Sequence, residues 1–178
     1  MQTRVIADEA EISRVFTRMA HEILETNHGA DSLILLGIPT RGVFTAQRLA
    51  KEIEAIENTT VPVGSLDITM YRDDLRRHPT REAKRSQIPA DIDDAIVVLV
   101  DDVLFSGRTI AAAFDALKDI GRPKAIRLAV LVDRGHRELP IAADTVGRSI
   151  LTAADERVRV LLREYDGRDA IEIARESK

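Results

Sequence analysis

The chain has 178 residues, a formal net charge of −4 and no cysteine. This length suits one domain, and the absence of cysteine excludes disulfides and cysteine-based zinc sites. The acidic balance, with four Phe, two Tyr and no Trp, argues against a surface that binds nucleic acid throughout, so any RNA contact must be a local basic patch. The charged N-terminus does not resemble a signal peptide, and no apolar run reaches the ~20 residues of a membrane span. We therefore expect a cytoplasmic protein that does not bind membranes.

The expected elements alternate between helices and buried strands. Apolar residues with helical spacing run from Ile12 to Leu24, and Asp8 with Glu11 forms a capping-box pattern at the start of that helix. Residues 32–37 are typical of a buried strand and residues 40–51 of a helix. Further along, we expect strands at 61–68, 96–100 and 125–132, a helix at 107–120 closed by Gly121, and short strands near 145–146, 158–162 and 170–173.

This alternation favours an α/β fold whose central, mostly parallel sheet is flanked by helices. Ligands of such folds bind at the carboxyl ends of the strands. Residues 73–88 are polar and rich in Arg and Lys, so we expect a long mobile loop or a pair of exposed strands there. No linker rich in Pro, Gly or Ser divides the chain.

The most informative motif is VVLVDDVLFSGRT, which spans residues 97–109. Asp101 and Asp102 (the acid pair) end a strand, where they can accept hydrogen bonds from two adjacent ribose hydroxyls and hold Mg²⁺, directly or through water. Residues 106–109 (the phosphate loop) offer backbone N–H groups and two hydroxyls at a helix N-terminus, which suits a phosphate dianion. Gly107 lets the backbone approach closely. Either half alone is more often a turn or a helix cap, but together they predict a ribose 5-phosphate site.

The motif resembles, position by position, the 5-phosphoribosyl-1-pyrophosphate (PRPP) motif of type I phosphoribosyltransferases. The resemblance implies a type I phosphoribosyltransferase fold with a small hood and a flexible flap, formed by residues 1–178 as a single domain. Catalysis would involve the acid pair and Arg41. The implied substrate contacts are Val97, Val98, Leu99, Val100, Asp101, Asp102, Val103, Leu104, Phe105, Ser106, Gly107, Arg108 and Thr109.

The resemblance extends to an earlier loop, residues 37–42 (the pyrophosphate loop), which follows the expected strand at 32–37. In it Thr40 and Arg41 would grip the pyrophosphate, Arg41 through forked donors. Alone, this hexapeptide would more often be an ordinary turn. The basic segment that begins with Tyr71 and Arg72 resembles the flap that closes over PRPP, although any one of its charged residues is equally consistent with a solvated loop.

Longer segments narrow the resemblance to the PyrR family, whose members are pyrimidine operon regulators and uracil phosphoribosyltransferases. These segments read FTRMAHEI (16–23), SLDITMYRDDL (65–75), VDRGHRELPI (132–141) and LREYDGRDAIEI (162–173). The resemblance covers the chain from about Arg14 to Ile173. It implies that uracil and PRPP react to give UMP and pyrophosphate with Mg²⁺ present. It also implies binding of a pyrimidine-operon mRNA leader promoted by UMP or UTP, and a homodimer or higher homo-oligomer.

Phe105 bears on the choice of base. Purine enzymes of this fold carry a carboxylate three positions after the second acid, and a Phe there cannot exchange a proton with a purine ring. By resemblance, residues of about 140–178 supply most of the hood, Asp133 and Arg134 flank the base, and main-chain groups at Val146 read the uracil edge. Residues 144–147 are almost as consistent with an ordinary strand.

The PyrR resemblance implies RNA contacts at Thr17, Arg18, His21, His136, Arg137 and Arg148. The first three share one exposed helix face, opposite much of the apolar stripe, and alone they suit a solvated face. In residues 149–153 the chain departs from the family, because Leu151 and Ala153 replace the usual Pro and Ser. Two readings stay open: an enzyme that also regulates through RNA, or a salvage phosphoribosyltransferase that binds no RNA.

Overall fold

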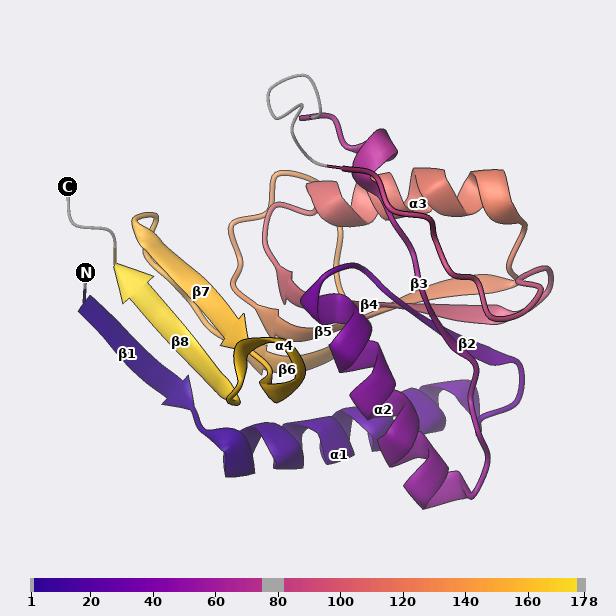
Figure 1. Cartoon of the computed structure of the whole chain (residues 1–178), viewed down its shortest axis with the longest axis horizontal. Helices are drawn as coiled ribbons and strands as arrows, with labels where there is room; N and C mark the ends of the chain where they lie inside the picture. The colour runs from indigo at the N-terminus through magenta and orange to yellow at the C-terminus, as the bar shows by residue number, and fades with distance from the viewer. Residues whose placement is uncertain (1, 75–81, 176–178) are drawn as a thin grey trace.

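The computed structural model describes residues 2–74 and 82–175, which form two sheets (Figure 1). The core sheet is parallel, in the order β3-β2-β4-β5-β6, and contains β2 (Leu33–Gly37), β3 (Val63–Ser65), β4 (Ile96–Leu104), β5 (Ala125–Asp133) and β6 (Thr145–Ser149). The small sheet is antiparallel, in the order β1-β8-β7, and contains β1 (Gln2–Ala7), β7 (Glu156–Leu161) and β8 (Ala170–Arg175). The expected α/β architecture is confirmed.

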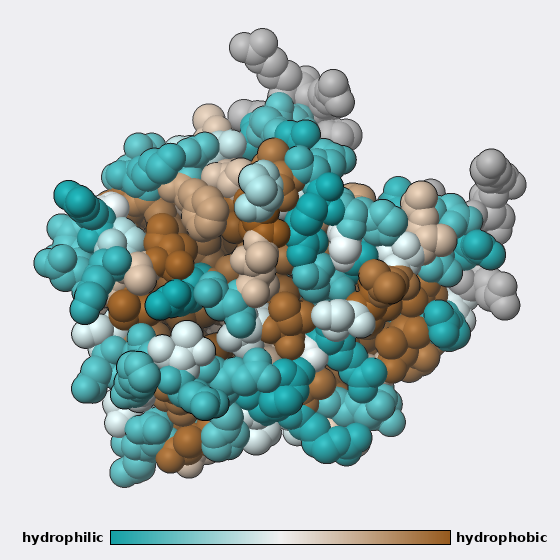
Figure 2. Space-filling view, turned by 180° about the vertical axis from the view of Figure 1, so that it is seen from behind, coloured by the Kyte–Doolittle hydropathy of each residue, from teal (hydrophilic) through white to brown (hydrophobic). Residues whose placement is uncertain are grey.

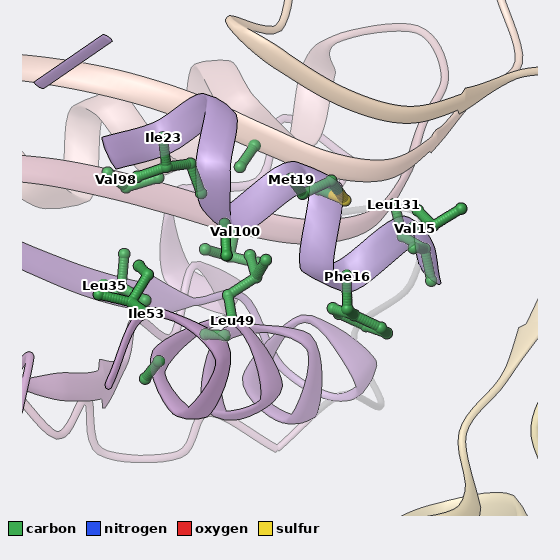
Figure 3. Close-up of a cluster of buried hydrophobic side chains, with 14 of the residues drawn as sticks. Val15, Phe16, Met19, Ile23, Leu35, Leu49, Ile53, Val98, Val100 and Leu131 are labelled. Carbon is green, nitrogen blue, oxygen red and sulfur yellow. The ribbon is translucent and has the colours of Figure 1, made fainter. Parts of the chain in front are cut away.

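Three long helices flank the core sheet: α1 (Glu9–Asn27), α2 (Arg41–Glu57) and α3 (Arg108–Ile120). Side chains of β4 alternate between two hydrophobic layers, because successive residues of a strand point to opposite faces. Val98 and Val100 join the layer under α1 and α2, whereas Val97 and Leu99 join the layer under α3. Figure 3 shows the first layer, where Phe16 of α1 lies near side chains of α2 and of the core strands.

Local sequence patterns correctly predict the start of α1 and the end of α3. Asp8 accepts the N–H of Glu11 at 2.9 Å, and the Glu11 carboxylate accepts the N–H of Asp8 at 3.0 Å, so the predicted capping box is confirmed. α3 ends at Gly121, whose N–H donates to the carbonyl of Leu117. α2 runs on to Glu57 because its apolar face continues beyond the predicted end.

The ends of the chain meet in the small sheet. β1, which the sequence pattern does not predict, pairs with β8, and the single-turn helix α4 (Arg163–Asp166) connects β7 to β8. Thr145–Ser149, which we expected in the hood, instead forms the edge of the core sheet beside β5. The small sheet stands beside the carboxyl ends of the core strands (Figure 1), so it takes the place expected for a hood. That residues 1–178 form one domain stays a prediction.

The expected flap is described only in part. Residues 75–81 lie outside the described residues. After them, residues 82–86 have no regular secondary structure, and Gln87 forms an isolated antiparallel bridge with Ser65. No helix in the described ranges is both long and apolar enough to cross a bilayer. On the face opposite to that of Figure 1, hydrophobic residues emerge in separate areas bordered by hydrophilic ones (Figure 2).

Candidate active site

The pyrophosphate loop and the acid pair meet because β2 and β4 are parallel neighbours. The N–H of Ile38 donates to the carbonyl of Val100 at 2.9 Å. A Cβ built on Gly42 would lie 2.6 Å from the same carbonyl oxygen and 3.2 Å from the Cα of Asp101. The first turn of α2 therefore touches the strand that carries the acid pair, and only glycine at position 42 permits this approach.

A cleft of about 740 Å³ opens beside this contact. Its walls include Arg41 from the pyrophosphate loop, Arg72 and Lys84 from the flap segment, and the acid pair from β4. Its volume lies in the ~300–1,000 Å³ range of small-molecule sites. Asp67 and Glu82 also line the cleft. Charges of Arg72 and Arg41 act on Asp101 and Asp102 respectively, an arrangement suited to an anionic sugar that also carries hydroxyl groups.

The acid pair lies inside β4 because the strand extends to Leu104, four residues beyond the predicted end at Val100. β5 continues beside it and pairs Leu104 with Asp133, which stabilises the extension. Asp101 is buried, and its carboxylate accepts the N–H of Asp102 at 2.9 Å. Burial and the adjacent Asp102 carboxylate raise the pKa of Asp101 well above its ordinary value. Hydroxyl donors or a cation at this site would relieve that unfavourable charge.

The phosphate loop is a tight turn between β4 and α3. Gly107 has φ 92°, in the left-handed region, and the carbonyl of Ser106 accepts the N–H of Leu139 at 3.0 Å. α3 begins at Arg108, so its first unpaired N–H groups face this turn. A hollow of about 280 Å³ is lined by residues 103–110, by residues 72–74 and by Asp101. The candidate phosphate site thus adjoins the acid pair.

The two predicted flap residues, Tyr71 and Arg72, have different surroundings. Arg72 lines the cleft and binds Asp74 through Nε and Nη2, both at 2.8 Å. Tyr71 instead donates its hydroxyl to Asp119 near the end of α3, at 2.6 Å. The root of the flap segment is therefore held against α3, with Arg72 on the cleft side. Tyr71 is not among the described residues that line the cleft.

Phe105 and Arg134 meet at the carboxyl ends of β4 and β5. The guanidinium carbon of Arg134 lies 4.1 Å from the centroid of the Phe105 ring, which is 44% exposed. Arg134 is buried and also donates to the carbonyl of Glu156 at 2.8 Å, at the start of β7. Asp133 is close by, and although burial raises its pKa, hydrogen bonds led by that from Arg137 lower it overall. Arg134 therefore links the acid-pair motif to the small sheet.

Val146 lies elsewhere. It is inside β6, paired with Val130, and its carbonyl accepts both terminal nitrogens of Arg18 at 3.3 Å. It is absent from the described residues that line the cleft. Contact of the Val146 main chain with the uracil edge stays a prediction.

The chain is similar to known proteins along nearly its whole length. The family model for the phosphoribosyl transferase domain matches residues 3–161. "Bifunctional protein PyrR" of Streptomyces coelicolor is 63% identical over 171 residues, which cover 96% of this chain and 89% of that protein. Proteins with the same name from Leifsonia xyli and Bacillus subtilis are 60% and 53% identical, each covering 97% of both chains. The chain belongs to the PyrR family.

Solved structures agree on the fold of this PyrR family member. A hypoxanthine phosphoribosyltransferase from Staphylococcus aureus matches with a TM-score of 0.71 at 19% identity, covering 97% of this chain and 92% of that one. A hypoxanthine-guanine phosphoribosyltransferase from Bacillus anthracis has a TM-score of 0.71 at 17% identity, covering 99% and 100%. At such identities the likeness concerns the fold alone, and it confirms the type I phosphoribosyltransferase fold.

The first three RNA candidates lie exposed on α1, as expected. Two of them already have protein partners: Thr17 donates to Glu52 of α2 at 2.9 Å, and Arg18 donates to the carbonyl of Gly147. His21 borders a shallow groove between the ends of α1 and α2. Arg18 thus joins α1 to β6 as well as facing solvent.

Of the other three RNA candidates, Arg148 lies beside α1, whereas His136 and Arg137 lie near Phe105. Arg148 binds Glu11 of α1 at 3.0 Å and so adjoins the α1 face. Arg137 instead donates to the carbonyl of Phe105 at 2.8 Å, and the His136 ring lies 6.3 Å from the Phe105 ring. Among the described contacts, none joins His136 or Arg137 to α1.

Sequence reasoning did not single out the residues of α4. Nε and Nη2 of Arg41 donate to the carboxylate of Asp166 at 3.0 and 2.7 Å, and the guanidinium lies over the Tyr165 ring. The family-like segment 162–173 contains these residues. Its sequence does not indicate, however, that Asp166 contacts Arg41. A helix of this length has too few residues to show periodicity.

Proposed function

We propose that this PyrR family member transfers the phosphoribosyl group of PRPP to uracil, giving UMP and pyrophosphate. We also propose that it binds a pyrimidine-operon mRNA leader in response to uridine nucleotides and thereby lowers expression of pyrimidine biosynthesis genes. The observation that carries the catalytic half is that Arg41 and the acid pair line one cleft while the phosphate loop lines the hollow beside it, with Asp101 and Thr109 shared by both. These groups match the ribose hydroxyls, the 5-phosphate and the pyrophosphate of a single ligand.

Each part of the site has a role in the transfer. The acid pair accepts the ribose hydroxyls, the phosphate loop binds the 5-phosphate, and Thr40 and Arg41 bind the leaving pyrophosphate. The transition state resembles an oxocarbenium ion, so catalysis consists mostly of positioning and of stabilising the charge of the leaving group. We assign no general base.

The carboxylates of the acid pair suit a Mg²⁺ ion that is shared with substrate phosphates. The described residues contain no group of three or more His, Cys, Asp or Glu that could hold a metal ion. Four carboxylates line the cleft, and of these Asp101 and Asp102 are adjacent at the end of β4. Mg²⁺ commonly keeps several waters and binds through one or two carboxylates plus substrate phosphates. When bound, it neutralises charge on the diphosphate. The acid pair would hold it directly or through water.

The surroundings of Phe105 support a pyrimidine rather than a purine. The position lacks the carboxylate that serves purine rings, and the Phe105 ring is instead covered on one side by the guanidinium of Arg134. Asp133 and Arg134, at the end of β5, stay our proposed flank for the base. Arg134 also donates to the hydroxyl of Thr152 and to the carbonyl of Glu156, so its guanidinium has fixed partners on the side of the small sheet.

The enzymatic half is tested by steady-state release of pyrophosphate that depends on uracil, with PRPP and Mg²⁺ present. The variant with both Asp101→Asn and Asp102→Asn should lose turnover while keeping the circular dichroism of the native fold. Full activity in that double variant would refute the assignment of the acid pair.

The regulatory half is tested by titrating RNA from the operon leader with the protein, with and without UMP. The RNA contacts we propose are Thr17, Arg18, His21, His136, Arg137 and Arg148, and a homodimer or larger assembly in the cytoplasm would align their basic faces. Because phosphate contacts release counterions, affinity should fall with salt. No binding at moderate salt, or no effect of UMP, would favour the alternative of a salvage enzyme that binds no RNA.

A further inference from the structure

One edge of the Arg41 guanidinium is held by α4. Nε and Nη2 donate to the two carboxylate oxygens of Asp166 at 3.0 and 2.7 Å, and the guanidinium carbon lies 5.1 Å from the centroid of the Tyr165 ring. The side chain of Asp166 is only 13% exposed. A two-point pair of this kind fixes the plane of the guanidinium as well as its position.

The other edge of the same guanidinium is available to a ligand. Within the described ranges, no hydrogen bond uses Nη1 of Arg41, and Arg41 lines the cleft together with Asp102 and Thr109. The guanidinium of Arg41 thus lies between the carboxylate of Asp166, in α4, and the acid pair at the end of β4. The Nη1 donors of Arg41 are therefore available to a ligand in the cleft that Arg41 lines.

α4 is itself fastened to α2. Arg48, two turns after Arg41 and therefore on the same side of the helix, binds Glu164 at 2.6 and 2.8 Å and Asp169 at 2.7 and 2.8 Å. Asp169 also accepts the N–H of Arg163 at 2.7 Å. Because two carboxylates hold Arg48, the position of α4 does not depend on Asp166 alone.

We infer that Asp166 is a positioning residue for phosphoribosyl transfer, holding Arg41 so that its Nη1 edge faces the diphosphate of PRPP. The inference rests on the proposed function. A long side chain that is ordered before the ligand arrives loses less conformational entropy on binding. Asp166 therefore contributes to the binding of the diphosphate group, and not to the affinity for uracil.

The test is Asp166→Asn, which keeps an oxygen that can accept the N–H of Leu162 (2.8 Å in the native chain) and so preserves the start of α4. We expect KM for PRPP, and the dissociation constant for inorganic pyrophosphate measured by calorimetry, to rise roughly tenfold, the cost of ordering one flexible side chain. The KM for uracil should stay within about twofold.

Glu164→Gln is the matched control. It removes one carboxylate partner of Arg48 from the same helix while Asp169 remains, so KM for PRPP should change less than about twofold. Melting temperatures of both variants report whether α4 stays in place. An Asp166→Asn variant with unchanged or lower KM for PRPP would overturn the inference, and so would an equal rise in Glu164→Gln.

The two proposals fail in different ways. If the native protein releases no pyrophosphate from PRPP with uracil, the proposed function fails. The pyrophosphate titration still decides the role of Asp166 in that case, because it requires no turnover. A titration in which Asp166→Asn binds pyrophosphate as tightly as the native protein counts against Asp166 alone.

Discussion

Gly42 of α2 approaches the carbonyl oxygen of Val100 so closely that a Cβ on Gly42 would lie 2.6 Å from it. The oxygen cannot move aside, because it accepts the N–H of Ile38 and belongs to the central strand β4. The start of α2 and the end of β4 are therefore placed relative to each other by a residue that has no side chain. This contact sets the distance between Arg41 and the acid pair.

Gly42→Ala should therefore push α2 away from β4. We expect kcat/KM for phosphoribosyl transfer to fall by about 10²-fold, as displacements near 1 Å can cause, and the free energy of unfolding to fall by about 1–3 kcal/mol from overpacking. Enzyme assays and urea unfolding measure the two effects.

Gly29→Ala is the control for Gly42→Ala. Gly29 has φ +117° and no neighbour within 4 Å of a built Cβ, and it follows the end of α1, away from the cleft. The Gly29→Ala variant should lose about 1 kcal/mol of folding stability through backbone strain and keep its enzymatic activity. If Gly42→Ala also kept full activity, the contact with Val100 would not determine the site.

Asp101→Asn should make the protein more stable and less active. The pKa of Asp101 is raised by burial and by Asp102, so between the ordinary value of 3.8 and the raised one the native state binds a proton that the unfolded chain has released. The contribution of Asp101 to stability therefore falls as pH rises through that window.

Asn carries no charge, so Asp101→Asn should gain about 0.5–2 kcal/mol at neutral pH and nothing below about pH 4. Urea unfolding from pH 4 to pH 8 checks this. A stability difference that does not depend on pH would show that the charge of Asp101 is not its cause.

Phe105→Leu should weaken the base side of the site. The Phe105 ring covers the buried guanidinium of Arg134 at 4.1 Å, a contact of about 0.5–2 kcal/mol, so we expect KM for uracil to rise several-fold while KM for PRPP stays nearly constant. Phe105→Tyr keeps the ring and serves as the control. Equal changes in both Michaelis constants would mean that Phe105 acts through the phosphate loop instead.

Arg18→Ala and His21→Ala should differ although both residues lie on the same face of α1. Arg18 donates to the carbonyls of Val146 and Gly147, so its loss should lower the melting temperature together with RNA affinity. His21→Ala should lower RNA affinity by about 1–2 kcal/mol at unchanged melting temperature. Filter binding at two salt concentrations, with UMP present, measures the affinities. Native affinity in both variants would exclude this face of α1 from the RNA surface.

Features that depend on neighbouring residues were determined by the sequence alone. The capping box of Asp8 and Glu11, the end of α3 at Gly121 and the acid pair followed by a helix N-terminus are local patterns, and the structure has the first two where they were predicted. The expectation of a parallel sheet likewise follows from the alternation of elements. PyrR family membership also follows from sequence, because family-like segments run along most of the chain.

Only the tertiary structure decided which distant residues meet. The ion pair of Arg41 with Asp166 joins α2 to α4, and β1 reaches β8 at the opposite end of the chain. The same is true of Val146, whose carbonyl accepts a hydrogen bond from Arg18 of α1. Such contacts depend on strand order and on the packing of whole elements, and neither leaves a periodic signal in the residues themselves.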